Sequence, residues 1–91
     1  MNQITILMTP FNPFGARTND HKEVFSFQSE KVGVEAAELA FHLTNAPLEV
    51  LSDEELEIIE KYKGRSLSVG DIVKVNDTKY LCAMMGWKEI A

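Results

Sequence analysis

Apolar and polar residues alternate near the start of the chain, in residues 3–8 and again in residues 23–28. In an extended segment, side chains at every second position lie on one face, and the β-branched and aromatic residues here favour that state. The pattern therefore predicts two N-terminal strands. The side chains that would face the core are Ile4, Ile6 and Met8 in the first strand and Phe25 and Phe27 in the second.

Residues 9–15 join these strands and cannot form a regular element, because two prolines fix the backbone and remove amide donors. The polar stretch continues to Lys22, which makes the connection longer than most. Such a loop is either mobile or a binding element.

The spacing becomes helical from Val34 to Asn45, where apolar residues recur three and four positions apart. Pro47 follows shortly and cannot continue the helix, which makes Asn45 its expected end. The predicted apolar stripe consists of Val34, Ala37, Leu39, Ala40, Phe41 and Leu43.

A second helix is predicted from Ser52, which forms a capping box with Glu55. Leu51 and Leu56 occupy the positions of a hydrophobic staple around this start. Two lysines would lie in the last turn and Gly64 just beyond it, so we expect the helix to end there.

The last third of the chain has the pattern of a β-hairpin with a closing strand. Residues 68–71 read as a turn that leads into a strand at 72–75, and Asn76-Asp77 suits a tight reversal. The return strand at 78–84 is apolar on both faces, which predicts either a central strand covered on both sides or a strand with one face covered by an intermolecular contact. Gly86 interrupts the run, and residues 87–90 form a short final strand.

Together these elements predict an α+β fold for the whole chain, residues 1–91, as one domain. Strands at both ends with helices between them indicate a small mixed or antiparallel sheet, made of two N-terminal strands and a C-terminal hairpin, packed against two helices. Ninety-one residues suffice for one such core.

Composition narrows the classes of function. The chain carries 14 acidic and 9 basic residues, a net charge of −5, which disfavours direct binding to nucleic acid or to an anionic membrane. No apolar run approaches the roughly 18 residues of a membrane span, and the N-terminus lacks the basic region of a secretory signal. One cysteine cannot form an intramolecular disulfide. These features predict a cytoplasmic protein.

The stretch from Tyr62 to Ile90 resembles the YodL-like family of small bacterial domains. The matching parts are residues 64–71, the strand at 72–75, Tyr80 and the pair Gly86-Trp87. The biochemical role of that family is poorly defined. The resemblance implies an origin in a bacterial genome or in a mobile element such as a phage, plasmid or conjugative element.

Residues suited to catalysis or to metal binding are few and scattered. Cys82 is the only thiol and would need a nearby base, such as His21 or His42, to act as a nucleophile. A zinc site needs three or four convergent ligands, and no such spacing occurs. We therefore predict no enzymatic activity, metal or cofactor, with an enzyme that uses Cys82 as the remaining alternative.

Two interpretations apply to the polar and aromatic residues of the C-terminal third. They either complete turns and seal the core, or they form a surface that binds a partner protein, for which arginine and aromatic residues are favoured anchors. The predicted binding residues are Arg65, Ser68, Asp71, Tyr80, Trp87 and Lys88.

The first hypothesis for function is a non-catalytic accessory or protein-interaction domain, with an unidentified protein partner and a homodimer as a further possibility. The second is an acidic inhibitor of host defence that presents carboxylates in place of DNA phosphates. Its candidate residues are Glu49, Asp53, Glu54, Glu55, Glu57 and Glu60.

Overall fold

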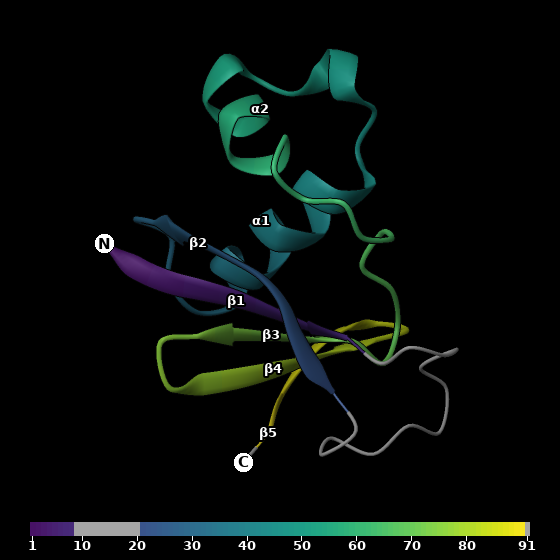
Figure 1. Cartoon of the computed structure of the whole chain (residues 1–91). Coiled ribbons are helices and arrows are strands. Elements are labelled where there is room, and N and C mark those ends of the chain that lie inside the picture. Colours follow the sequence, from purple (N-terminus) through teal and green to yellow (C-terminus); the bar gives the residue numbers. More distant parts are fainter. Residues whose placement is uncertain (9–20, 91) are drawn as a thin grey trace.

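The computed structural model describes residues 1–8 and 21–90, which form the predicted α+β fold (Figure 1). Within this part of the chain, five strands make one antiparallel sheet in the order β2-β1-β3-β4-β5. The strands are β1 (Asn2–Met8), β2 (Lys22–Ser29), β3 (Ile72–Val75), β4 (Thr78–Ala83) and β5 (Gly86–Ile90). The helices are α1 (Gly33–Asn45) and α2 (Asp53–Ile59), with a short 3-10 turn, η2 (Leu48–Val50), between them. The predicted loop at residues 9–15 lies outside the described residues.

Both helices lie on the same face of the sheet, with α1 next to it and α2 farther away (Figure 1). The alternation predicted for β1 is confirmed, because Ile4, Ile6 and Met8 are all buried. In β2, Phe27 is buried and Phe25 packs against the same core. The sheet's apolar face and the helices therefore share one interior.

The predicted hairpin of β3 and β4 is confirmed, with its reversal at Asn76, whose φ is 54°. This residue also joins the hairpin to the first strand. Its amide nitrogen donates to the carbonyl oxygen of Gln3 at 2.8 Å, and its side-chain oxygen accepts from the amide of Gln3 at 3.0 Å. The hairpin tip is thus fixed to the N-terminal strand, and β1 and β3 pair along Ile4–Leu7.

The predicted bounds of the first helix are confirmed to within one residue, but its buried face differs from the predicted stripe. Ala36, Ala37, Ala40 and Leu43 are buried, whereas Val34 and Phe41 are exposed. The small side chains of Ala36, Ala37 and Ala40 allow α1 to lie close to the sheet. The helix is therefore rotated about its own axis so that these alanines face the sheet. The larger Val34 and Phe41 are left on the flank of the helix.

The capping box of the second helix is confirmed. Ser52 Oγ accepts from the amide of Glu55 at 3.2 Å, and Glu55 Oε1 accepts from the amide of Ser52 at 2.9 Å. The predicted end of this helix near Gly64 is wrong, because α2 ends at Ile59. The amide of Tyr62 instead donates to the carbonyl of Ile59, three residues back, as in a tight turn.

Contacts of Tyr62 account for this early end. Its ring packs on Phe25 with the centroids 5.3 Å apart, and its hydroxyl donates to the carbonyl oxygen of Arg65 at 2.5 Å. A Cβ on Gly64 would collide with the Tyr62 ring. The glycine therefore makes room for an aromatic anchor on the sheet, and does not cap α2.

The return strand β4 is an inner strand of the sheet, because it pairs with β3 on one side and β5 on the other, and the helices cover one of its two faces. The prediction that it continues through Met84 is wrong. It ends at Ala83, and Met84 and Met85 form the turn to β5, with both side chains exposed. Gly86 begins β5 with a φ of 113°, which allows the tight reversal at that point.

Within the residues described, no helix is long and apolar enough to cross a membrane.

Candidate functional site

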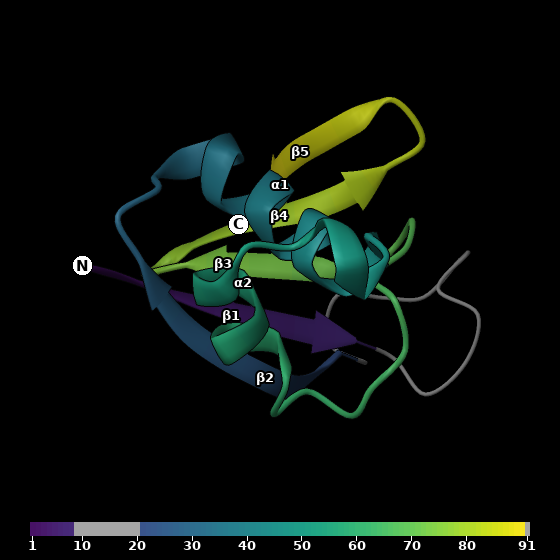
Figure 2. The same cartoon turned by 90° about the horizontal axis from the view of Figure 1, so that it is seen from above.

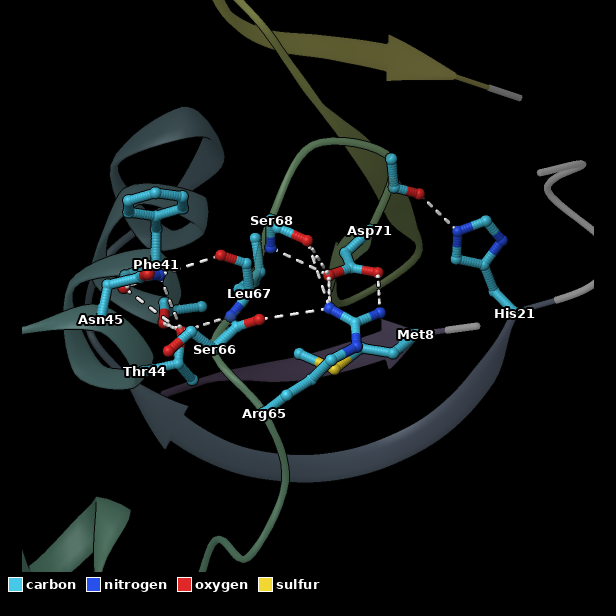
Figure 3. Close-up of polar contacts among 12 residues, drawn as sticks. Met8, His21, Phe41, Thr44, Asn45, Arg65, Ser66, Leu67, Ser68 and Asp71 are labelled. Atoms are coloured by element: carbon cyan, nitrogen blue, oxygen red, sulfur yellow. Dashed lines mark hydrogen bonds and ion pairs between the residues drawn. The ribbon is translucent and has the colours of Figure 1, made fainter. Parts of the chain in front are cut away.

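The segment between α2 and β3 has no regular structure, yet it is held firmly at the end of α1 (Figure 3). The backbone of Leu67 bonds to two side chains of the last helical turn. Its amide donates to Thr44 Oγ1 at 3.1 Å, and its carbonyl oxygen accepts from Asn45 Nδ2 at 3.0 Å. The Leu67 side chain is buried in the core. These contacts fix the segment where it passes from the helices to the sheet.

Asp71 is the centre of a second set of contacts, shown in Figure 3. Its side chain is fully buried, and its two carboxylate oxygens accept from the guanidinium of Arg65 at 2.6 and 2.8 Å. The amide of Ser68 donates to the same carboxylate at 2.9 Å. Hydrogen bonds to Asp71 raise the pKa of Arg65, so this guanidinium remains charged. A bidentate arginine pair of this kind compensates the burial of the carboxylate.

Gly70 connects this cluster to the sheet. Its φ of 96° lies in the left-handed region that favours glycine, and its amide donates to the carbonyl oxygen of Cys82 at 2.8 Å. The amide of Cys82 donates in turn to the carbonyl oxygen of Asp71 at 2.9 Å. Nε2 of His21 lies 2.5 Å from the Gly70 carbonyl oxygen, an acceptor, so this nitrogen is the donor. The turn thereby extends the pairing between β3 and β4.

The six predicted binding residues do not come together as one surface. Arg65, Ser68 and Asp71 form the cluster just described, in which Asp71 is buried and Arg65 is exposed. Tyr80 and Trp87 lie on the face of the sheet that carries the helices, and both are partly buried against the core. Lys88 is exposed and pairs with Leu81. Because it directly follows Trp87 in the strand, its side chain lies on the opposite face of the sheet, away from the helices.

A groove of about 570 Å³ lies between the C-terminal half of α1 and the β4–β5 hairpin. Most of its lining is apolar, and two of the apolar lining residues are exposed to solvent, Phe41 to 39% and Met84 to 79%. Met85, beside it in the turn, is 99% exposed. The apolar lining residues are Phe41, Ala46, Cys82, Ala83, Met84 and Trp87.

Of the residues that line this groove, Trp87 is the only one among the binding residues predicted from the sequence. The sequence predicts Phe41 in the apolar stripe of the first helix and Met84 at the end of the return strand. The signal that could have identified Phe41 is the set of alanines in the helix, because small residues mark the side that approaches the sheet most closely.

The polar part of the groove has a negative character. Glu38 contributes an exposed carboxylate, and none of the described residues in the lining is a lysine or arginine. His42 also lines the groove and points towards α2, with Nε2 3.3 Å from Glu55 Oε2. The pKa of Glu55 is lowered, chiefly by the hydrogen bond from the backbone of Ser52 and also by the Ser52 hydroxyl and by His42.

Cys82 lies at the floor of the groove, where its side chain is almost completely buried. Burial raises the pKa of this thiol, and the charge of Asp71 raises it further. A nucleophilic cysteine requires the opposite shift, towards the thiolate. In the described part of the chain, no three side chains of His, Cys, Asp or Glu type lie close enough to hold a metal ion.

The acidic residues of α2 divide into two groups. Glu55 faces α1 through its contact with His42. The others are exposed, and helical spacing places Asp53, Glu57 and Glu60 along one side with Glu54 next to them. Glu49, in η2, is exposed as well.

Comparisons of the chain with models of protein families, with curated proteins and with solved structures found no match. The resemblance of residues 62–90 to the YodL-like family stays a prediction from the residues themselves.

Proposed function

We propose that this chain is a protein-interaction domain, without catalytic activity of its own, that binds a partner protein in the groove between α1 and the β4–β5 hairpin. The observation that carries the proposal is the exposure of Phe41 and Met84 on either side of this apolar groove. Exposed apolar side chains that gather around a concavity are typical of interaction sites, and aromatic residues and methionine are enriched there.

The setting of this function is part of the proposal. The resemblance to the YodL-like family supports an accessory role in a bacterial protein or in one from a mobile element. The single cysteine supports a location in the cytoplasm. The charge of −5 supports a protein as the partner in preference to nucleic acid.

A photo-crosslinking experiment tests the proposal. The photoreactive residue p-benzoylphenylalanine replaces Met84 in one variant and Val50 in another, and each is irradiated in a bacterial lysate. Val50 is a matched control, because it is apolar, exposed and outside the groove lining. We expect a discrete protein adduct from position 84 only. Equal adducts from both positions, or none from position 84, would contradict the proposal.

A second candidate function is an acidic inhibitor that imitates DNA. It is supported by the exposed stripe of Asp53, Glu54, Glu57 and Glu60, whose regular spacing can stand in for a row of phosphates. If this is correct, the domain will compete with duplex DNA for a DNA-binding defence protein. Replacement of the four carboxylates by amides will abolish the competition, whereas Met84→Gln will leave it unchanged.

A further inference from the structure

We infer that the occupant of the groove is an amphipathic helix with a basic residue beside its apolar side. This inference rests on the proposed function, and it specifies the chemistry of the partner. Its two parts, the helical form and the positive charge, follow from different observations.

The helical form follows from the layers of the fold. α1 packs on β1, β3 and β4, whereas the turn between β4 and β5 extends past both helices (Figure 2). The groove therefore has α1 as one wall and the side chains of Cys82, Met84 and Trp87 as its floor and far wall. A helix beside α1 would continue the helical layer over the uncovered end of the sheet. Its apolar side chains would enter the groove three and four residues apart.

The free edge of β5 fits an added strand less well. This edge lies on the side of β5 away from β4, because β5 is the last strand of the sheet. A strand paired there would extend the sheet and leave the exposed Phe41 uncovered. Lys88 also lies in the middle of this short edge strand, a position where lysine is known to discourage edge-to-edge pairing.

The positive charge follows from the carboxylate of Glu38 in the groove and from that of Glu89 on the same face of the sheet as Trp87. Glu38 lines it, is exposed and makes no ion pair with any other described residue. Glu89 is outside the lining, but it follows Trp87 by two positions and therefore lies on the same face of β5. A lysine or arginine of the partner would complement these charges, and complementary charges favour one partner over others.

A second copy of the chain is a poorer occupant for the same reason. Each copy carries a net charge of −5, so self-association would bring two acidic surfaces together. Antiparallel pairing of two β5 edges about their central residue would also place Lys88 of one copy opposite Lys88 of the other. Like charges directly opposite each other are unfavourable in a sheet.

Selection from a displayed peptide library tests the inference. The probe is a phage library of random peptides of roughly 18 residues, long enough for an isolated helix to form. The full-length wild-type chain is the target, and peptides that still bind Phe41→Gln are removed. We expect the enriched peptides to share apolar residues three and four positions apart. We also expect a lysine or arginine at a position that lies beside this apolar side of the helix.

A charge-exchange experiment on the best enriched peptide tests the role of Glu38. Glu38→Lys should weaken binding by roughly three- to tenfold, as expected for reversal of one partly exposed charge pair, and a peptide with its basic residue changed to glutamate should recover the loss. Glu35→Lys is the matched control, since Glu35 is exposed on the same helix but outside the lining. Equal effects of the two variants would overturn the charge assignment.

The remaining outcomes are distinguishable from failure of the proposed function. Enriched peptides with apolar residues at every second position, or without a basic residue, would overturn this inference while groove binding itself stands. Failure to enrich any peptide that requires Phe41 would also overturn it, and the adduct at position 84 would then decide the proposed function separately. Sedimentation that shows a dimer of the wild type, lost in Met84→Gln, would identify a second copy as the occupant instead.

Discussion

The guanidinium of Arg65 binds both carboxylate oxygens of Asp71, at 2.6 and 2.8 Å, and thereby neutralises a fully buried charge. Asp71 lies directly before β3, and Arg65 lies in the irregular segment that follows α2. The pair therefore joins the helical layer to the sheet at the point where the chain crosses between them.

We expect Arg65→Met to lower the free energy of unfolding by about 2–3 kcal/mol, because it leaves the Asp71 carboxylate buried without its partner. This is less than the roughly 3–5 kcal/mol of a fully buried pair, since the Arg65 side chain is 39% exposed and water screens it. Urea unfolding measures the change. Lys63→Met removes the same charge from an exposed neighbour and should change stability by less than about 0.5 kcal/mol. Similar losses in both variants would show that the pair contributes nothing specific.

The lowered pKa of Glu55 predicts a dependence of stability on pH. Its ordinary value is 4.5, and hydrogen bonds from Ser52 lower it in the folded chain. The folded state thus binds this proton less readily than the unfolded state, and the contribution to stability is present above pH 4.5. It is lost as the pH falls through the lower, folded-state pKa.

Glu55→Gln isolates this contribution, because glutamine can still accept the hydrogen bond from the Ser52 amide. At pH 7 we expect a loss of about 0.5 kcal/mol, the scale of a charge at an exposed helix N-terminus. The difference from the wild type should shrink as the pH falls below 4.5. Glu57→Gln is the control, and a difference for Glu55→Gln that stays constant with pH would contradict the prediction.

The raised pKa and burial of Cys82 predict an inert thiol. Iodoacetamide reacts with the thiolate, so native Cys82 should be labelled only when the chain opens. The double variant Cys82→Ala, Met84→Cys carries a thiol two residues away at an exposed position and should react on the order of a hundredfold faster. Mass spectrometry over time measures both rates. Comparable rates would reopen the alternative of an enzyme that uses Cys82.

The close approach of α1 to the sheet predicts a low tolerance for larger residues at its alanines. Ala40 is fully buried, so Ala40→Leu should lower stability by about 1–3 kcal/mol through overpacking. Glu38→Leu adds a leucine to an exposed position in the middle of the same helix and should change stability by less than about 0.5 kcal/mol. Thermal unfolding compares the two. An unchanged melting temperature for Ala40→Leu would show that α1 can move away from the sheet.

The sequence predicted those features of the fold that depend on local spacing. Alternation defined β1 and β2, Asn76 defined the hairpin turn, and Ser52 with Glu55 defined the start of α2. Each of these signals arises from residues within a few positions of one another. Their agreement with the structure reflects short-range chemistry that the tertiary fold reinforces.

The features that the sequence did not predict depend on contacts between distant residues. α2 ends at Ile59 because Tyr62 is anchored on Phe25, which lies 37 positions away in the chain. The exposure of Phe41 depends on how α1 is rotated about its axis against the sheet. A prediction from hydrophobic spacing buries a phenylalanine in preference to an alanine, whereas in the structure the alanines are buried and Phe41 is exposed. The groove could not be predicted either, since it exists only where α1 and the β4–β5 hairpin diverge.

The exposed position of Met84 predicts that binding and stability can be separated. Its side chain is 79% exposed in the β4–β5 turn, so Met84→Gln should change the free energy of unfolding by less than about 0.5 kcal/mol. The same change places a polar amide in the apolar lining of the groove and should weaken capture of the partner by about tenfold, as expected for an interface anchor. Trp87→Ala should reduce both quantities, because Trp87 packs against the core as well. Quantitative capture of the crosslinked partner and urea unfolding measure the two effects. A Met84→Gln variant with reduced stability and normal capture would assign Met84 to the fold and remove it from the binding surface.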